Sequence, residues 1–323
     1  MRDHAGMSTA TVYAEFAARE TRGISPSYER LSTAVSRDDE MLCLLGRLPS
    51  AKRQPNLLFG VVRFLGGPVD DPAAFRRYAL ENWPVIEEQL RSRATQTNEP
   101  GRCAVLLPVL AALPQPLALL DVGAAAGLCL YPDRYGYLYG DQRIGAGAPI
   151  LECAASGMTL PARLPEVVWR AGLDLNPLDV TDPADLMWLD ALIWPEHTHR
   201  RARLRAAAAH VAGDPPLLVR GDLVDDLPAL AAQAPAAATL VVFHTSVLYQ
   251  VPPPRREAFV TAVRALPGHW IANEPPDVLT FPGRPAPPDE ALQNVLSVDG
   301  TPLAWNRSHG QAITWFGLQT GLS

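Results

Sequence analysis

Lysine is almost absent from this chain. Of its 28 lysine and arginine residues, only Lys52 is a lysine, so a catalytic lysine is excluded at every other position. The 323 residues contain no run of 18 or more consecutive apolar residues, which argues against a membrane-spanning helix. The amino-terminal stretch carries acids and lacks an apolar core, so we expect no secretory signal.

Cysteine is scarce, and its spacing carries no metal-binding signature. The four cysteines are far apart and form no C-x-x-C pair: Cys43, Cys103, Cys129 and Cys153. This spacing excludes a disulfide framework and a zinc site, and it predicts reduced, mostly buried thiols. His197 and His199 lie in a polar turn where we expect them to be solvated, so we expect no metal. The predicted compartment is the cytoplasm.

The charge and composition are those of an ordinary globular protein. The net charge is −6 at pH 7, and 48% of the residues are apolar while 19% are charged. An acidic balance argues against nucleic acid, which favours a basic face. We expect a small-molecule substrate, with neither nucleic acid nor a membrane as partner, and the oligomeric state is left open.

The chain changes character near residue 114. Residues 1–113 show apolar positions at helical spacing and no strand alternation, which predicts a helical cap or lid. Residues 114–323 alternate strands with helices, which predicts an α/β fold with a mostly parallel sheet. The five expected parallel strands lie within 116–123, 167–177, 216–225, 238–248 and 268–276. A final antiparallel pair is expected from 294–306 and 309–318, with Asp299-Gly300 as a turn signal.

The most informative stretch is 116–127, PLALLDVGAAAG. An apolar run ends in Asp121 and passes at once into Gly123, Ala125 and Gly127. This predicts a buried strand and a tight turn that opens a helix, where glycine lets a ligand approach the main chain. A plain small-residue turn that packs a helix on a sheet would have the same sequence pattern.

Two further acids come after the next two expected strands. Asp174 comes just after the second strand and Asp222 just after the third. A carboxylate at the second strand end can accept hydrogen bonds from ribose hydroxyls. Each acid alone could instead cap a helix or turn. Three acids at three successive strand ends are harder to explain in that way.

The D-x-G-x-A-x-G pattern and these acids resemble class I, Rossmann-like methyltransferases, which bind S-adenosylmethionine (SAM). Ala125 stands where that family usually has its middle glycine. The resemblance implies that Asp121, Gly123, Ala125 and Gly127 form the first motif of the cofactor site. It also implies that Asp174 with Leu175 contacts the ribose and that Asp222 contacts the adenine amino group. The backbone of Leu223 would then contact a ring nitrogen.

Candidate catalytic residues come after the fourth and fifth expected strands. His244 lies at the edge that faces the transferred methyl group in this superfamily, as a cofactor contact and candidate base, or else as a buried structural histidine. Glu274 is expected to line the substrate pocket. Ser246 lacks a surrounding G-x-S-x-G, which excludes a hydrolase nucleophile. Upstream, Arg102 is expected to hold a carboxylate of the cofactor or substrate, or to serve a structural role.

The interval between Gly123 and Asp174 contains an insertion at about 131–150 with tyrosines at 131, 135, 137 and 139. Its alternation predicts an added hairpin, and the tyrosines are expected to pack. Segments across nearly the whole chain also resemble a bacterial domain-of-unknown-function family (2332), among them QPNLLFGVVRFLG, TQTNEPGRCAVLLP and VVFHTSVLYQVPPPRR. The sequence therefore predicts a SAM-dependent methyltransferase. A SAM cyclase or lyase, an NAD-dependent oxidoreductase and a non-catalytic SAM-binding module remain alternatives.

Overall fold

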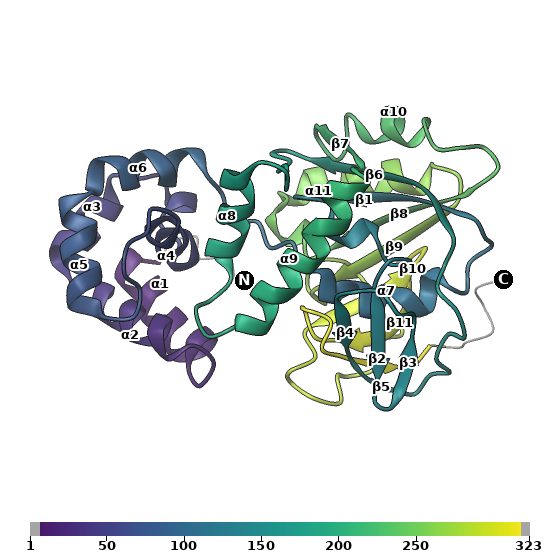
Figure 1. Cartoon of the computed structure of the whole chain (residues 1–323), viewed down its shortest axis with the longest axis horizontal. Helices are drawn as coiled ribbons and strands as arrows, with labels where there is room; N and C mark the ends of the chain where they lie inside the picture. The colour runs from purple at the N-terminus through teal and green to yellow at the C-terminus, as the bar shows by residue number, and fades with distance from the viewer. Residues whose placement is uncertain (1–6, 318–323) are drawn as a thin grey trace. The chain divides into compact units, whose positions relative to one another are not determined.

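The computed structural model describes residues 7–317 and divides the chain into two compact units (Figure 1). The first unit holds the residues up to Thr97 together with Thr181–Ala202. The second holds Asn98–Val180 and the chain from Arg203 onward. Residues 1–6 and 318–323 lie outside the described part, and with them the start of the amino-terminal stretch considered for a leader and the end of the last expected strand.

The first unit is helical, as the sequence predicted. Its helices are α1 (Thr9–Glu15), α2 (Pro26–Val35), α3 (Asp39–Gly46), α4 (Pro55–Phe64), α5 (Pro72–Glu81), α6 (Trp83–Ser92) and α8 (Pro183–Leu192). Several begin at a side chain that accepts a hydrogen bond from the first turn, including Ser25 before α2 and Asp71 before α5. Proline at the first helical position of α2, α4, α5 and α8 fits because no partner is needed for its missing N–H.

Helix α4 is the centre of this unit. Phe59 is fully buried and meets Tyr13, Tyr28 and Phe75 with ring centroids 4.8–6.0 Å apart. On another side α4 packs against α8, where a Cβ built on Gly60 would lie 2.9 Å from Leu192. Helix α8 therefore belongs to this unit although it is distant in sequence.

The second unit is built on a nine-stranded sheet with the order β5-β12-β11-β10-β9-β8-β1-β6-β7. The strands are β1 (Leu117–Val122), β5 (Ala154–Ser156), β6 (Val167–Asp174), β7 (Leu217–Arg220), β8 (Thr239–Thr245), β9 (His269–Glu274), β10 (Asn294–Val298), β11 (Thr301–Asn306) and β12 (Ala312–Trp315). The five strands from β9 to β7 in that order are mutually parallel. The mixed α/β fold with a mostly parallel sheet is thus confirmed.

The carboxyl-terminal part of the sheet differs in detail from the expected antiparallel pair. Three antiparallel pairings occur here, β9 with β10, β10 with β11 and β11 with β12, and β12 in turn pairs parallel with β5. The hairpin turn at Asp299-Gly300 is confirmed, with φ of 51° and 85°. Positive φ at both positions suits the twist of a two-residue hairpin.

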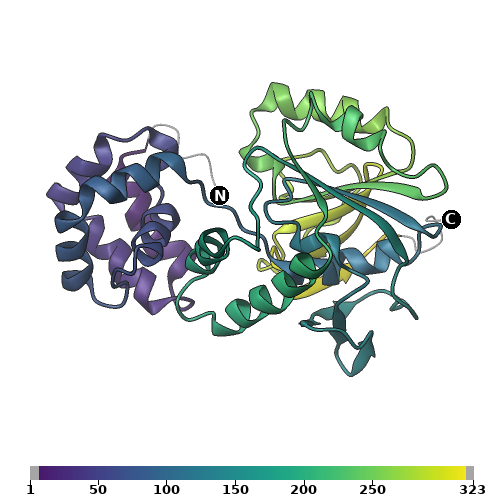
Figure 2. The same cartoon turned by 45° about the horizontal axis from the view of Figure 1, so that its top comes forward.

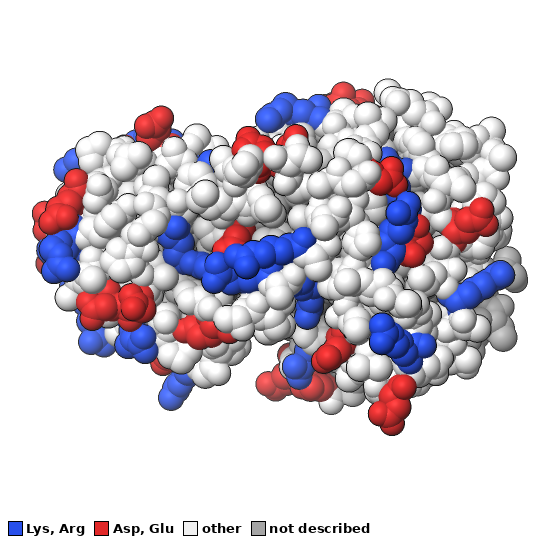
Figure 3. Space-filling view, in the orientation of Figure 1, with Lys and Arg blue, Asp and Glu red and all other residues white. Residues whose placement is uncertain are grey.

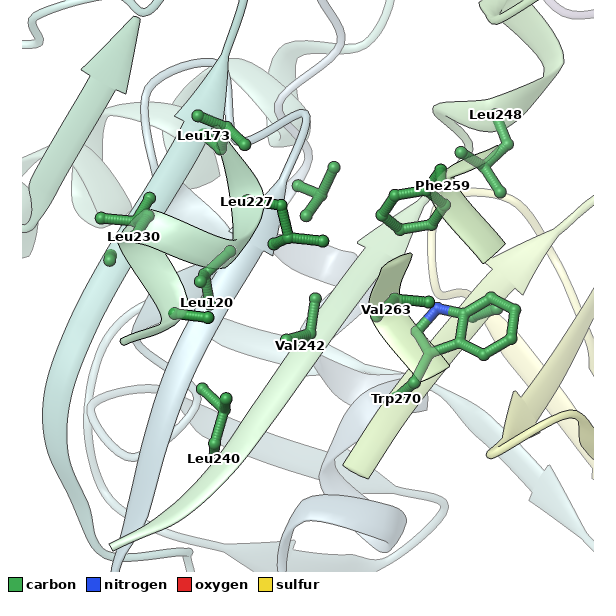
Figure 4. Packing of buried hydrophobic residues seen from close by; sticks show 14 of the residues in the cluster. Leu120, Leu173, Leu227, Leu230, Leu240, Val242, Leu248, Phe259, Val263 and Trp270 are labelled. Carbon is green, nitrogen blue, oxygen red and sulfur yellow. The ribbon is translucent and has the colours of Figure 1, made fainter. Parts of the chain in front are cut away.

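Helices cover both faces of this sheet (Figure 2). Helices α10 (Leu227–Ala231) and α11 (Pro253–Arg264) lie on one face, and α7 (Cys103–Leu110) lies on the other with residues 203–213 of α9 (Thr198–Gly213). Beneath α10 and α11, apolar side chains of four parallel strands form a buried core (Figure 4). Its members include Leu120, Leu173, Val242, Phe259 and Trp270. No helix in residues 7–317 has the length and apolar character needed to cross a membrane.

The insertion forms a small separate sheet of β2 (Gly136–Tyr139), β3 (Gln142–Ile144) and β4 (Ile150–Glu152). Strands β2 and β3 form the predicted hairpin. The tyrosine hydroxyls donate to main-chain carbonyls, as Tyr135 does to Leu128 at 2.7 Å and Tyr137 to Pro132 at 2.6 Å. These side chains are buried packing residues, as expected.

The division at 113/114 is displaced in the structure. The boundary lies at Thr97/Asn98, and α7 packs within the second unit because all its residues are buried there. Residues 181–202, expected within the sheet domain, belong to the helical unit. Contacts distant in sequence, such as that of α4 with α8, set these limits.

Candidate functional site

The order of the parallel strands creates a switch point between β1 and β8. From β1 the chain proceeds to β6 and then β7 on one side, whereas β8 and β9 lie on the other. In such sheets ligands bind outside the carboxyl ends of the strands, where the order reverses. The residues just after Val122, Asp174 and Thr245 therefore mark the candidate site.

The turn after β1 has the backbone that its composition predicted. Gly123, Ala125 and Gly127 have φ of 79°, 48° and 74°. The Gly123 N–H donates to the carbonyl of Leu173 at 2.7 Å, which ties the turn to the end of β6. A Cβ on Gly123 would lie 2.4 Å from a methyl carbon of Val247, so only glycine fits at this position.

The helix expected after this turn is absent, which corrects the prediction. Gly127 leads into a single 3₁₀ turn, Leu128–Leu130, and the Leu128 N–H donates to Oδ1 of Asn98 at 3.0 Å. Pro132 comes two residues after Leu130, and the residue before a proline is disfavoured in the helical region. The turn therefore offers no α-helix amino terminus.

Asp121 and Arg102 are two buried ionisable residues, and the Arg102 guanidinium acts electrostatically on the Asp121 carboxyl. The two residues are 3% and 6% exposed. Burial raises the pKa of the Asp121 carboxyl well above its ordinary value, while the Arg102 guanidinium acts in the opposite direction. Arg102 donates to the carbonyl of Thr245 at 2.7 Å and to that of Ser308 at 3.1 Å. Its short 3₁₀ turn, Pro100–Arg102, is capped by Glu99, which accepts from the Gly101 N–H.

Asp174 is at the expected strand end, and its carboxylate binds the glycine turn. Oδ2 accepts from the Ala125 N–H at 2.8 Å, and Oδ1 accepts from the Asn176 N–H at 2.8 Å. The side chain thus fixes the shape of the turn. A ribose contact would use the remaining acceptor capacity of the same oxygens. Leu175, the next residue, is 69% exposed.

Asp222 also lies at its strand end, but within a local acidic turn. Burial alone would raise its pKa, yet hydrogen bonds from the N–H groups of Val224 and Asp225 and the guanidinium of Arg255 hold that pKa below its usual value. These contacts match the turn-capping alternative. Leu223 is partly buried against the core described above.

His244 is a satisfied buried histidine in this structure. Its side chain is fully buried, and the indole N–H of Trp270 donates to Nε2 at 2.9 Å. An indole nitrogen only donates, so Nε2 accepts and Nδ1 carries the proton. Nδ1 donates to Oε1 of Glu274 at 2.6 Å. Neither nitrogen is free to take a proton from a substrate, so the geometry favours the structural alternative over the predicted base.

Glu274 is equally buried and organises the loop after β8. Besides His244, its Oε1 accepts from the N–H groups of Val247 at 2.9 Å and Leu248 at 3.2 Å. Val247 is the residue that packs on Gly123. Glu274 therefore does not line an open pocket as expected, but positions the loop that contacts the glycine turn.

A second group of polar side chains gathers on the opposite sheet face from His244. Thr245 and Asn273 are neighbours in register, and side chains alternate along each strand. Asn294 donates to the hydroxyl of Ser246 at 2.9 Å, and Asn306 donates to Oδ1 of Asn273 at 2.8 Å. Ser246 has φ of 54°, which is unusual for a residue with a side chain and typical of strained functional sites.

Sequence reasoning missed Asn294 and Asn306 as members of the site. The available signal was an asparagine at one end of each of two mainly apolar strands, β10 and β11. The two local histidines, His197 and His199, belong to the helical unit. Across residues 7–317, no group of three His, Cys, Asp or Glu side chains is arranged to hold a metal ion.

Comparison with known proteins identifies a family whose description names no activity. The model of a family described as "Uncharacterized protein conserved in bacteria (DUF2332)" matches residues 10–315. No curated protein and no solved structure matches the chain.

Proposed function

The chain belongs to this uncharacterised bacterial family, and from its site we propose a SAM-dependent methyltransferase that acts on an oxygen or nitrogen of a small molecule. The observation that carries the proposal is the burial of two ionisable residues of opposite type, Asp121 and Arg102, at the switch point where the glycine turn lies. The end of β1, the chemistry of the buried charges and the surface charge each support it.

The missing helix after β1 favours a cofactor without phosphate. Dinucleotide sites place a pyrophosphate at the amino terminus of the helix that the glycine turn opens. Here the turn leads only into Leu128–Leu130. A nucleoside that carries an amino acid in place of a phosphate does not need that helix, so the geometry favours SAM over NAD.

The buried charges suit the amino-acid end of SAM. A carboxylate would pair with Arg102, and an ammonium would pair with Asp121. Burial raises the pKa of the Asp121 carboxyl. A neighbouring positive charge favours the ionised form, so this carboxyl gains most when a cation binds beside it. The turn amides and Asp174 would hold the nucleoside part, with Asp222 at the far strand end.

The chemistry SAM supplies is an activated methyl group, so the protein's task is alignment and exclusion of water. His244 and Glu274 are occupied with each other and with the loop after β8. Their role is to hold that loop, and through Val247 the glycine turn, in a fixed position. A nitrogen acceptor has less need of a general base than a hydroxyl does.

A small-molecule acceptor agrees with the charge distribution. Figure 3 shows Lys and Arg side chains interspersed with Asp and Glu on the right-hand side of the view, while Lys and Arg side chains gather near its centre. The chain as a whole carries a net charge of −6. A nucleic-acid acceptor would favour a net basic protein.

The test is calorimetric titration of the full chain with SAM, S-adenosylhomocysteine and NAD. We expect binding of the first two and none of NAD. Asp121→Asn should weaken SAM binding about tenfold or more, since a charge-assisted contact is lost. Asp141→Asn, the same change at an exposed turn residue, is the matched control. Asp174→Ala should abolish binding because it frees the turn amide of Ala125.

The outcomes separate the alternatives. Absence of binding by the folded wild type would overturn the SAM proposal, and binding of NAD would support an oxidoreductase. If SAM binds, mass analysis of the product decides the reaction. S-adenosylhomocysteine indicates methyl transfer, methylthioadenosine indicates a cyclase or lyase, and no turnover across many acceptors indicates a binding module.

A further inference from the structure

The asparagine cluster, Asn273, Asn294 and Asn306, is the part of the site whose polar groups are incompletely paired. All three side chains are no more than 1% exposed. Asn273 lies near the end of β9, Asn294 begins β10 and Asn306 ends β11. These three adjacent strands therefore bring the asparagines together where the strands end on one side of the sheet. A uniform set of neutral amides at one strand edge is not required for packing, since the same strands are otherwise largely apolar.

Two atoms of this cluster have no hydrogen-bond partner within residues 7–317. They are Nδ2 of Asn273, a donor, and Oδ1 of Asn306, an acceptor. Leaving a buried polar atom unpaired costs free energy, so such atoms in a folded protein call for an explanation. The other two amide atoms of these residues form a hydrogen bond, in which Nδ2 of Asn306 donates to Oδ1 of Asn273 at 2.8 Å.

The result is the same whichever way the amides are oriented. If both amides were turned over, Asn273 would donate to Asn306, and the unpaired atoms would again be one donor and one acceptor. The orientation described is the better one because Asn306 Nδ2 also donates to the Asn294 carbonyl at 3.4 Å. The pair therefore always presents one donor and one acceptor.

The cluster is continuous with the proposed cofactor site. Asn273 is the register neighbour of Thr245, whose carbonyl and hydroxyl accept from Arg102 at 2.7 and 3.2 Å. Asn294 donates to Ser246, the strained residue next to Val247. A ligand held by the cluster would therefore lie beside the carboxyl end of β8.

From this geometry we infer that Asn273 and Asn306 bind the acceptor substrate through a neutral group with both a hydrogen-bond donor and an acceptor, a carboxamide or a hydroxyl. That this ligand is the methyl acceptor rests on the proposed function. Its binding to the two asparagines does not itself require SAM. A carboxylate would place oxygen against Oδ1 of Asn306, and an ammonium would place N–H against Nδ2 of Asn273. The cluster therefore selects against both ions.

The experiment uses the full chain labelled with ¹⁵N at asparagine, which gives seven side-chain amide signals. The probes are acetamide, ethanol, acetate and methylammonium, each at about 100 mM because ligands of this size bind weakly. We expect acetamide or ethanol to shift the Asn273 amide signal, and the two ions to leave it unchanged. Asn273→Gln assigns the signal.

Asn273→Asp replaces the unpaired donor by an acceptor and keeps Oδ1 for Asn306. This variant should bind acetamide about tenfold more weakly than the wild type and should gain binding of methylammonium. Asn82→Asp in the helical unit should leave the binding of both probes unchanged. The wild-type panel stands alone should the aspartate variant not fold. If acetamide alone shifts the Asn273 signal, the ligand group is a carboxamide. If ethanol alone shifts it, the ligand group is a hydroxyl.

The inference is overturned if no probe shifts Asn273, or if acetate or methylammonium does so as strongly as acetamide. Failure of SAM to bind in the calorimetric titration, with the probe shifts intact, would instead remove the proposed function and leave the neutral-ligand site standing.

Discussion

Asp121 shows how one residue can oppose folding and favour binding. A carboxyl that is 3% exposed costs free energy when it ionises, and that cost appears as its raised pKa. Groups perturbed by burial, with a specific charged neighbour such as Arg102, concentrate at functional sites. The same cost becomes an advantage when a cation enters, because the ionised form then gains a partner.

The pH dependence of stability tests this. The pKa of Asp121 is raised on folding, so its contribution to stability is fully present below the unfolded value of about 3.9 and is lost as pH rises through the folded value. We expect Asp121→Asn to be more stable than the wild type at neutral pH. Its advantage should grow as pH rises from about 4 and then level off. Urea unfolding at a series of pH values measures the difference.

Asp141→Asn, the same change at an exposed residue, serves here again as the control. An Asp121→Asn variant that is less stable than the wild type at neutral pH would show that the ionised carboxylate is already well paired in the absence of ligand.

Residue positions at the site were predictable, but their contacts were not. Asp121, Asp174 and Asp222 lie at three strand ends as the sequence indicated. The sequence could not show that backbone N–H groups donate hydrogen bonds to the carboxylates of Asp174 and Asp222, because the folded turns bring those donors into place. For His244, the indole N–H of Trp270 occupies Nε2, and that contact spans 26 residues.

At the scale of elements, the loop after β8 depends on Glu274. Its Oε1 accepts from His244, Val247 and Leu248. Glu274→Ala should lower the free energy of unfolding by about 3 kcal/mol or more, since two buried donors and one partly buried donor lose their acceptor. Glu274→Gln keeps an acceptor oxygen and should cost clearly less. Chemical denaturation compares the two, and equal losses would contradict the positioning role.

The glycine turn gives a second prediction at this scale. Gly123→Ala places a Cβ against Val247 at a φ of 79°, and it should destabilise by about 1–3 kcal/mol. Gly46→Ala, at the end of α3 with open space around it, should stabilise by about 0.4–1 kcal/mol. Thermal unfolding distinguishes the signs. Val247→Ala in the Gly123→Ala background should recover part of the loss, and no recovery would rule out the contact.

Elements were predicted well where periodicity is local. The five parallel strands, the hairpin at Asp299-Gly300 and the hairpin of the insertion all come from short-range patterns. The helix after β1 was wrongly predicted, although Pro132 stood in the sequence as a signal against it. Small residues alone predicted the turn, and a turn of this kind can lead into a helix or into a single 3₁₀ turn.

At the scale of the molecule, the helical unit is discontinuous in sequence. Composition placed one boundary near residue 113, because composition and periodicity describe only contiguous stretches of the sequence. The structure assigns 181–202 to the helical unit because α8 buries Trp188 and Leu189 there, and Gly60 lets Leu192 approach α4 closely. No local pattern records a pairing between segments over a hundred residues apart.

This pairing predicts the result of truncation. Removing residues 1–97 takes away α4 and leaves the apolar side of α8 without its packing partner, so the truncated chain should bind a hydrophobic dye and aggregate. Trp188→Ser with Leu189→Ser should reduce both effects in the truncated chain. In the full chain the same pair should destabilise the protein by about 3 kcal/mol or more, because large buried side chains are lost. Dye fluorescence and light scattering of the four proteins test this. If the truncated chain stays monomeric and dye-free, α8 is held by the second unit, and the division of the chain at 181–202 is wrong.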